Sequence, residues 1–242
     1  MPEKTSSYQS STTPPEVVNE QVSRRRFFNY AGLSATVILG ASSCKKFDFD
    51  FKDIFDKDKD KDKVNLGSGD IGILNYAYAL EQLEAAFYTK VTYSFYSQAS
   101  DKEKTYLDDI RDHEISHREF FKNVLGDKAI GKLEFDFSSI DFSNRASVLG
   151  TAKAFEDLGV SAYNGAGELL VSADYLLLAG KIVSVEARHA AAIRDLIKYG
   201  DFAGPDVVDE QGLDVFRKPK EVLKIADTYI VTKINANNLP TS

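Results

Sequence analysis

The sequence has 242 residues, a length that suffices for one domain of ordinary size with additional tails. Its formal net charge is −7. The acidic balance argues against nucleic acid as a partner, because phosphate binding requires a basic face. A single Cys excludes an internal disulfide and a Cys-based zinc site, and no apolar run reaches the roughly 20 residues that span a bilayer.

The first 43 residues follow the order of a secretory signal. After a polar stretch, Arg24 and Arg25 precede a short apolar segment at residues 30–41, and small residues follow. A basic region, an apolar core and small residues are the three parts of such a signal. The paired Arg residues resemble the twin-arginine class, so residues 1–43 are predicted to be an export signal. The alternative is a short amphipathic N-terminal helix.

The only Cys, Cys44, follows this segment in the sequence Leu-Gly-Ala-Ser-Ser-Cys. The pattern resembles a bacterial lipoprotein cleavage box, in which the Cys becomes the lipid-modified first residue, although Ala41 stands where Leu is usual. We therefore expect an exported protein of the periplasm or cell envelope, anchored to a membrane through Cys44. An unmodified thiol is the alternative.

Residues 44–67 are expected to form a charged tether. The run of alternating Asp and Lys at residues 56–63 has no apolar face, so it cannot offset the entropy cost of ordering. A calcium loop would need a Gly and a terminal Glu that this run lacks. The folded domain is expected to span residues 68–200, with residues 201–242 as a C-terminal extension.

Four amphipathic helices are predicted from apolar residues spaced three and four apart. They cover residues 70–98, 101–126, 145–171 and 174–199, and none contains Pro. The connection within each consecutive pair is short, whereas residues 127–144 form a long link. This pattern predicts an all-α antiparallel four-helix bundle, made of two hairpins joined by a crossover. A short C-terminal helix is expected from Pro219 to about Asn235, because Pro favours the first helical position.

Each predicted helix carries one Glu in the middle of its apolar stripe, although surface helices place carboxylates on the opposite face. These residues are Glu81, Glu114, Glu156 and Glu186. In the second and fourth helices a His follows three residues later, at His117 and His189. Positions i and i+3 point to one side of a helix, so each pair offers a carboxylate oxygen and an imidazole nitrogen together. Exposed Glu–His pairs are the alternative, which the apolar neighbours disfavour.

The two halves of the domain also repeat one another. Glu81 is followed by Tyr88, and Glu156 by Tyr163, at the same spacing of two helical turns. The repeat predicts two similar hairpins related by a pseudo-twofold axis.

One Glu from each of two helices and a Glu-x-x-His from each of the other two resemble the di-iron carboxylate proteins, such as ferritin, bacterioferritin and rubrerythrin. The segment 74–88 is most similar to exported bacterial ferritin-like proteins, and the resemblance covers about residues 70–200. It implies the metal ligands Glu81, Glu114, His117, Glu156, Glu186 and His189. It also implies that Tyr88 and Tyr163 hydrogen-bond ligand carboxylates, with simple core packing as their alternative role.

The charges of this set favour metal binding. Buried carboxylates are costly to desolvate and repel one another, and two divalent cations would balance four of them. The oxygen-rich donor set without Cys suits two iron or two manganese ions, although zinc would also bind. Glu84 is the alternative to Glu81 as a ligand, and Glu81 is favoured by its spacing from Tyr88. His113 is expected on the outer face and Glu168 in solvent.

The resemblance implies an oxidoreductase that oxidises iron or consumes dioxygen or peroxide outside the cytoplasm, with a dimanganese catalase reaction as a variant. Metal ions and a small oxidant are the expected partners. An oligomer is possible, but a large cage is not expected, because a lipid and a tether on every subunit would crowd a closed shell. A membrane-tethered metal-binding or structural module without turnover is the alternative. An interaction protein that has lost its metals is a third reading.

Overall fold

The computed structural model describes residues 63–241, so Arg24, Arg25, Cys44 and the remainder of residues 1–62 lie outside the described residues. The described part contains five α-helices, a single 3-10 turn and two short strands. In chain order they are β1 (Val64–Asn65), α3 (Gly69–Tyr93), α4 (Asp101–Leu125), η1 (Gly126–Lys128), α5 (Arg145–Gly167), α6 (Ala173–Ile197), α7 (Pro219–Ala226) and β2 (Ile234–Asn235).

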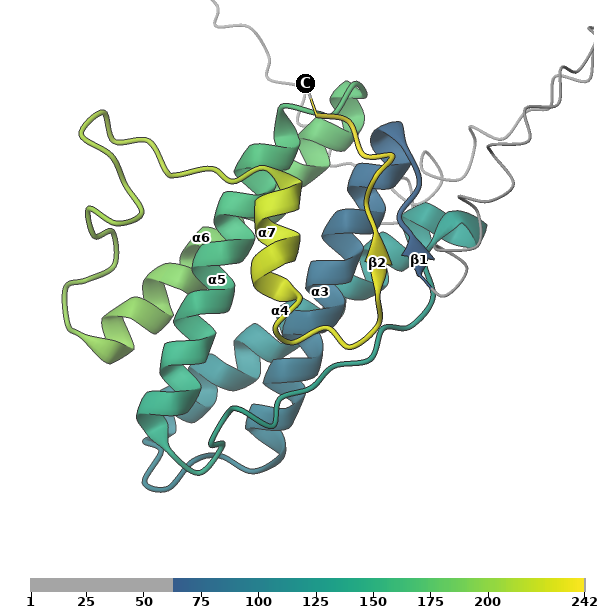
Figure 1. The fold of residues 1–242 in the computed structure, drawn as a ribbon. Helices are drawn as coiled ribbons and strands as arrows, with labels where there is room; N and C mark the ends of the chain where they lie inside the picture. The colour runs from purple at the N-terminus through teal and green to yellow at the C-terminus, as the bar shows by residue number, and fades with distance from the viewer. Residues whose placement is uncertain (1–62, 242) are drawn as a thin grey trace, which may run out of the picture. The chain divides into compact units, whose positions relative to one another are not determined.

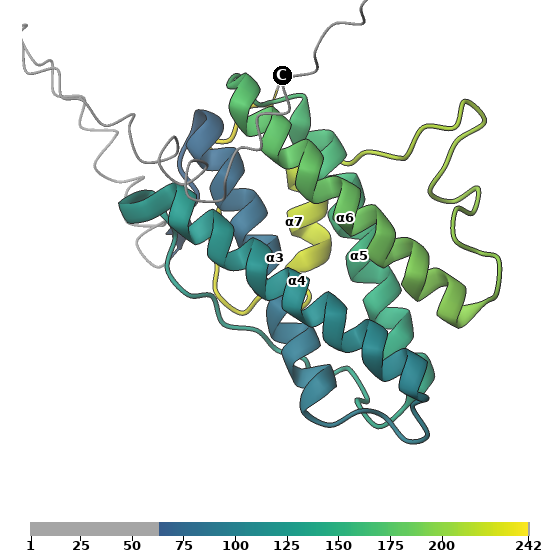
Figure 2. The same cartoon turned by 180° about the vertical axis from the view of Figure 1, so that it is seen from behind.

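The four long helices form two hairpins, because α3 packs mainly against α4 and α5 packs mainly against α6. Residues 126–144 run along the bundle and connect the end of α4 to the start of α5, so these two helices point in the same direction (Figure 1). The view from behind shows α4 and α6 side by side on the face opposite α7 (Figure 2). The prediction of an all-α helical bundle with a short C-terminal helix is confirmed.

The helix ends follow local signals, with some differences from the predicted bounds. Ser100 caps α4, and its side chain and that of Glu103 satisfy each other's backbone N–H groups. Gly126 ends α4 with a φ of 54°, a conformation that favours Gly. Helix α3 ends at Tyr93 rather than near residue 98, because Ser94 is already extended. Helix α6 ends at Ile197 with Lys198 as its cap, so Gly200 lies in the turn beyond it.

The crossover is held against α3 by two buried side-chain amides. Asn75 donates to the carbonyl of Lys128 over 2.9 Å and accepts from the N–H of Ile130 over 2.9 Å. Gln82 accepts from the N–H of Leu133 over 3.0 Å. These bonds satisfy backbone groups that the crossover would otherwise bury without partners. Within residues 63–241 no helix is long and apolar enough to cross a membrane.

The C-terminal extension returns to the bundle. Helix α7 packs against α5 and ends at Ala226, well before the expected end near Asn235, because the chain then extends into β2. Strand β2 pairs in parallel with β1, with Ile234 opposite Val64. Leu66, directly after β1, is fully buried. Packing of the described chain therefore begins before Ser68, within the last residues of the segment expected to be a tether.

Candidate metal centre

The Glu residues of the four apolar stripes meet in the interior of the bundle. Glu81 comes from α3, Glu114 from α4, Glu156 from α5 and Glu186 from α6, and each has a relative exposure of 0%. Their helices are amphipathic, so the face that buries the Leu, Ile and Phe side chains also directs these carboxylates inward. Each helix of the bundle thus contributes one carboxylate to a single buried cluster.

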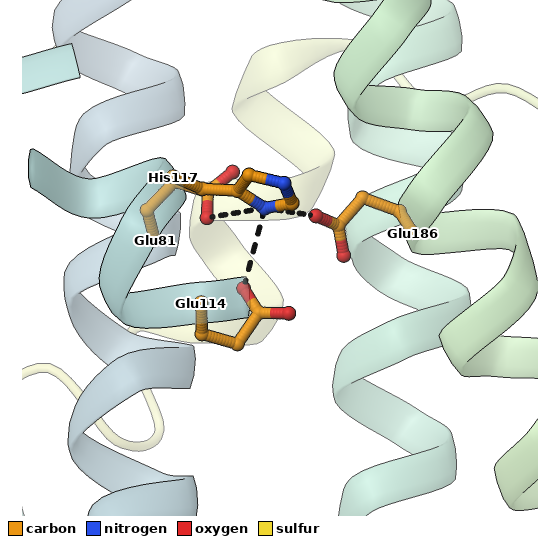
Figure 3. A group of neighbouring side chains, drawn as sticks. All are labelled: Glu81, Glu114, His117 and Glu186. Carbon is orange, nitrogen blue, oxygen red and sulfur yellow. Dashed lines mark ion pairs between the residues drawn. The ribbon is translucent and has the colours of Figure 1, made fainter. Parts of the chain in front are cut away.

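A first group forms around His117, as Figure 3 shows. The Nδ1 atom of His117 lies 2.7 Å from Glu186 Oε1, 3.5 Å from Glu81 Oε2 and 3.9 Å from Glu114 Oε2. The ligand atoms of these four residues lie within 4.8 Å of one another. Three carboxylates from three helices therefore converge on one imidazole nitrogen.

A second group forms around His189 in the same way. The Nδ1 atom of His189 lies 2.9 Å from Glu114 Oε1, 3.5 Å from Glu156 Oε2 and 3.5 Å from Glu186 Oε2. Here too the ligand atoms lie within 4.8 Å of one another, and all four residues are buried. The second group repeats the first, with Glu156 in the role of Glu81.

Glu114 and Glu186 belong to both groups and divide their oxygens between them. Glu114 directs Oε2 toward His117 and Oε1 toward His189. Glu186 directs Oε1 toward His117 and Oε2 toward His189. Two neighbouring donor groups that share two carboxylates in this way could hold a pair of cations.

The inward-facing atoms have no hydrogen-bond partners. They are Glu81 Oε2, both oxygens of Glu114, His117 Nδ1, Glu156 Oε2, both oxygens of Glu186 and His189 Nδ1. Buried polar atoms are rarely left without partners. Although some of these atoms approach within 3 Å, their geometry is not that of donor and acceptor. Oxygen and imidazole donors converging in this way fit divalent cations such as iron or manganese.

The pKa values show how the charges balance without a cation. Burial raises the pKa of Glu81, Glu114 and Glu156, and repulsion by Glu186 adds to the rise at Glu81 and Glu114. Burial alone would lower the pKa of His117, but Glu186 and Glu81 outweigh it and raise this pKa to about 10. Protonated imidazoles thus supply positive charge between the carboxylates.

Glu186 and His189 shift in the matching directions. Burial would raise the pKa of Glu186, yet its contacts with His117 and His189 lower it to about 2. Burial would lower the pKa of His189, but Glu156 and Glu114 raise it well above its ordinary value. Protons on the two imidazoles stabilise the cluster because they lie between the carboxylates. Cations that displaced those protons would be stabilised by the same carboxylates.

Two tyrosines bind the outer oxygens of the two unshared carboxylates. Tyr88 of α3 donates to Glu156 Oε1 of α5 over 2.5 Å. Tyr163 of α5 donates to Glu81 Oε1 of α3. Each bond crosses from one hairpin to the other and leaves the second oxygen of the carboxylate facing the cluster. The tyrosines therefore fix the orientation of Glu81 and Glu156.

The remaining acidic candidates lie apart from the two groups. Glu84 is buried, with 4% exposure, but it belongs to neither group and faces α5 at Gly159. Burial, followed by the charge of Glu114, raises the pKa of Glu84 well above its ordinary value. Glu168 is exposed at the end of α5.

His113 is exposed, as expected, but it is also part of the centre. Its Nδ1 atom lies 2.9 Å from Nε2 of His189, and the two rings are inclined by only 10°. This contact was not predicted from the sequence. The spacing contained a signal for it, because His113 precedes His117 by four residues and therefore lies on the same side of α4.

The helices that carry this centre correspond to a known domain. A family model described as a ferritin-like domain matches residues 69–199, which includes α3, α4, α5 and α6 and all six clustered residues. No curated protein matches the chain. The match covers more than half of the sequence, and the chain belongs to the ferritin-like domain family.

Proposed function

We propose that Glu81, Glu114, His117, Glu156, Glu186 and His189 bind two iron or two manganese ions, and that the protein is an oxidoreductase acting on dioxygen or peroxide. The observation that carries the proposal is the division of the Glu114 and Glu186 oxygens between two His-centred groups whose inward atoms lack hydrogen-bond partners. Such a donor set suits two adjacent cations and gives neither group more than one imidazole.

The residues of the chain perform distinct tasks in this proposal. Iron or manganese, when bound, supplies the electrons that reduce the oxidant. The carboxylates of Glu81 and Glu156 each offer one oxygen inward because Tyr163 and Tyr88 bind the other. His117 and His189 must lose a proton before Nδ1 can act as a ligand. The buried cluster excludes bulk water, which strengthens every electrostatic interaction within it.

The interior near the centre suits a small oxidant. A narrow apolar cavity at the end of the bundle is lined by Leu74, Phe121 and Leu170, and it reaches Tyr163. Tyr163 in turn contacts the candidate ligand Glu81. An apolar lining favours dioxygen over a charged substrate, because a charged group would lose its hydration there without gaining partners.

The test is the metal content of the full chain, measured by plasma mass spectrometry after loading with Fe²⁺ or Mn²⁺. About two ions per chain are expected, and a Glu114→Ala/Glu186→Ala variant should bind none. The control is Glu168→Ala, which changes an exposed carboxylate outside both groups. A folded protein that takes up neither metal would overturn the proposal. Two bound ions with no oxidant consumption would instead indicate a metal-binding module without turnover.

We also propose that the protein is exported and anchored to a membrane through a lipid on Cys44. The support is the sequence pattern of Arg24, Arg25, the apolar segment and Cys44. Replacing both arginines by Lys should leave the protein in the cytoplasmic fraction, and Cys44→Ser should abolish the mass of the attached lipid. Export and membrane association that persist in both variants would contradict this assignment.

A further inference from the structure

The two halves of the centre differ at one position. His113 directly precedes Glu114 in α4, and its pseudo-twofold counterpart, directly before Glu186 in α6, is Val185. His113 contacts the outer nitrogen of His189 over 2.9 Å. Val185 has no polar side-chain atom with which to contact the outer nitrogen of His117. Within residues 63–241, this contact therefore supports only one of the two candidate imidazole ligands.

The chemistry of the contact follows from the direction of the His189 ring. Its Nδ1 atom faces the carboxylates, so a neutral His189 that offers Nδ1 to a cation carries its hydrogen on Nε2. That N–H can donate to Nδ1 of His113, and His113 then keeps its own hydrogen on Nε2. The bond selects the tautomer of His189 that binds a cation and holds the ring in place.

Burial adds to the asymmetry. The side chain of His189 is 5% exposed, whereas that of His117 is 13% exposed. The rings of His113 and His189 are also nearly parallel, with centroids 5.1 Å apart, so the two nitrogens meet edge to edge, as an in-plane N–H···N hydrogen bond requires. The ring of His189 is therefore both hydrogen-bonded and buried. Because its orientation is already fixed, cation binding costs little side-chain entropy at this residue.

We propose that His113 is a positioning residue for His189, and that the Glu156–His189 position consequently binds a divalent cation more tightly than the Glu81–His117 position. This inference rests on the proposed function, because it presupposes that the six clustered residues are ligands. It assigns to His113 a role that its exposed place on α4 does not by itself suggest.

The test measures Mn²⁺ affinity by isothermal titration calorimetry of the full chain in two backgrounds. Glu81→Gln disables the position of His117, and Glu156→Gln disables that of His189. In the Glu81→Gln background, His113→Ala is expected to weaken the remaining Mn²⁺ binding about 10- to 100-fold, the usual effect of removing such a partner. In the Glu156→Gln background the same change should leave the affinity within about twofold.

Two further variants separate positioning from packing. His113→Asn keeps an acceptor near the place of Nδ1, so it should recover part of the affinity that His113→Ala loses. Val185→Ala truncates the pseudo-twofold counterpart and should leave the Glu156–His189 position unchanged. Equal effects of His113→Ala in both backgrounds, or no effect in either, would overturn the inference while the wild type still binds two ions. A wild type that binds no Mn²⁺ or Fe²⁺ would refute the proposed function instead.

Discussion

Tyr88 on α3 donates a hydrogen bond to Oε1 of Glu156 on α5 over 2.5 Å, while Oε2 of the same carboxylate lies 3.5 Å from Nδ1 of His189. One oxygen is therefore held by the protein and the other faces the centre. Tyr163 and Glu81 repeat the arrangement in the opposite direction. The tyrosines join the two hairpins and at the same time orient the two unshared carboxylates.

Removing one of these bonds should destabilise the protein. Tyr88→Phe leaves Oε1 of Glu156 buried without a donor, because Tyr88 and Glu156 both have 0% exposure. A loss of about 1–3 kcal/mol in the free energy of unfolding of the metal-free protein is expected, measured by urea titration. The control Tyr93→Phe changes a residue that is 92% exposed and should stay within about 0.5 kcal/mol. Equal stabilities of the two variants would contradict the role assigned to Tyr88.

Glu81 and Glu84 should respond in opposite ways to the same substitution. Glu81→Gln removes a charged donor from one group and should reduce binding from two ions to one, counted by mass spectrometry. Glu84→Gln should still bind two ions, because Glu84 belongs to neither group. It should also stabilise the metal-free protein at pH 7, because burial and then the charge of Glu114 raise the pKa of Glu84 well above its ordinary value, whereas Gln carries no charge.

The sign of that stabilisation follows from the raised pKa of Glu84. A carboxyl whose pKa is raised on folding stabilises the protein fully below its unfolded pKa, and this contribution is lost as pH rises through the folded pKa. Above the unfolded value near 4.5, Glu84 therefore becomes increasingly unfavourable, whereas Gln does not titrate. A Glu84→Gln variant that loses one of the two ions would show that Glu84, and not only Glu81, holds metal.

The features that the sequence predicted are those that follow from hydrophobic periodicity and from the chemistry of single residues. Apolar spacing located the four long helices, and a Glu in each apolar stripe identified the side chains that meet in the interior. Ser100 and Gly126 cap α4 through signals that are local to the sequence. All of this information lies within one or two helical turns of the chain.

Features that depend on distant segments were not predictable. The spacing of His113 and His117 indicates the side of α4 on which His113 lies, but its contact with His189 also requires the packing of α4 against α6, which neither helix encodes. Strands β1 and β2 have two residues each, too few for an alternating pattern, and their pairing joins the two ends of the described chain. Helix α7 ends at Ala226 because the following residues pair with β1 and the crossover, not because of a local stop signal.

Metal binding should release protons. In the metal-free protein, Glu186 and Glu81 raise the pKa of His117 to about 10, and Glu156 and Glu114 raise that of His189 further. Both imidazoles are therefore protonated at pH 7 and must become neutral to bind a cation, so at least about two protons per chain should appear in solution, and any proton held by Glu114 adds to that number. Calorimetry in buffers of different ionisation enthalpy measures this number. The Glu114→Ala/Glu186→Ala variant serves as the control and should release none.

The same pKa shift predicts how pH affects stability with and without metal. The folded pKa of His117, about 10, exceeds its unfolded value of about 6.5. Its stabilising contribution is therefore fully present below pH 6.5 and is lost as pH rises toward 10. Urea midpoints of the metal-free protein should fall between pH 6.5 and 9.5. Those of the manganese-loaded protein should fall less, because its imidazoles are already neutral. Parallel declines would contradict the proposed ion pairing.

The attachment of the C-terminal extension to α5 can be tested at a single glycine. The backbone N–H of Arg217 donates to the carbonyl of Ser161 over 2.9 Å, and its guanidinium donates to Ser161 Oγ over 2.7 Å. This close approach depends on Gly165, since a Cβ there would lie 1.9 Å from the carbonyl oxygen of Arg217. Either the extension must move or the helix must shift if a methyl group is added.

Gly165→Ala should therefore lower the free energy of unfolding by about 1–3 kcal/mol or more, the usual cost of overpacking. The matched control is Gly150→Ala on the same helix, where a Cβ would meet nothing within 4 Å. That change should stabilise the protein by about 0.5–1 kcal/mol, because Ala loses less backbone entropy than Gly in a helix. Urea titration measures both. If Gly165→Ala were as stable as Gly150→Ala, residue 217 would not pack against α5, and the extension would not contribute to the stability of the bundle.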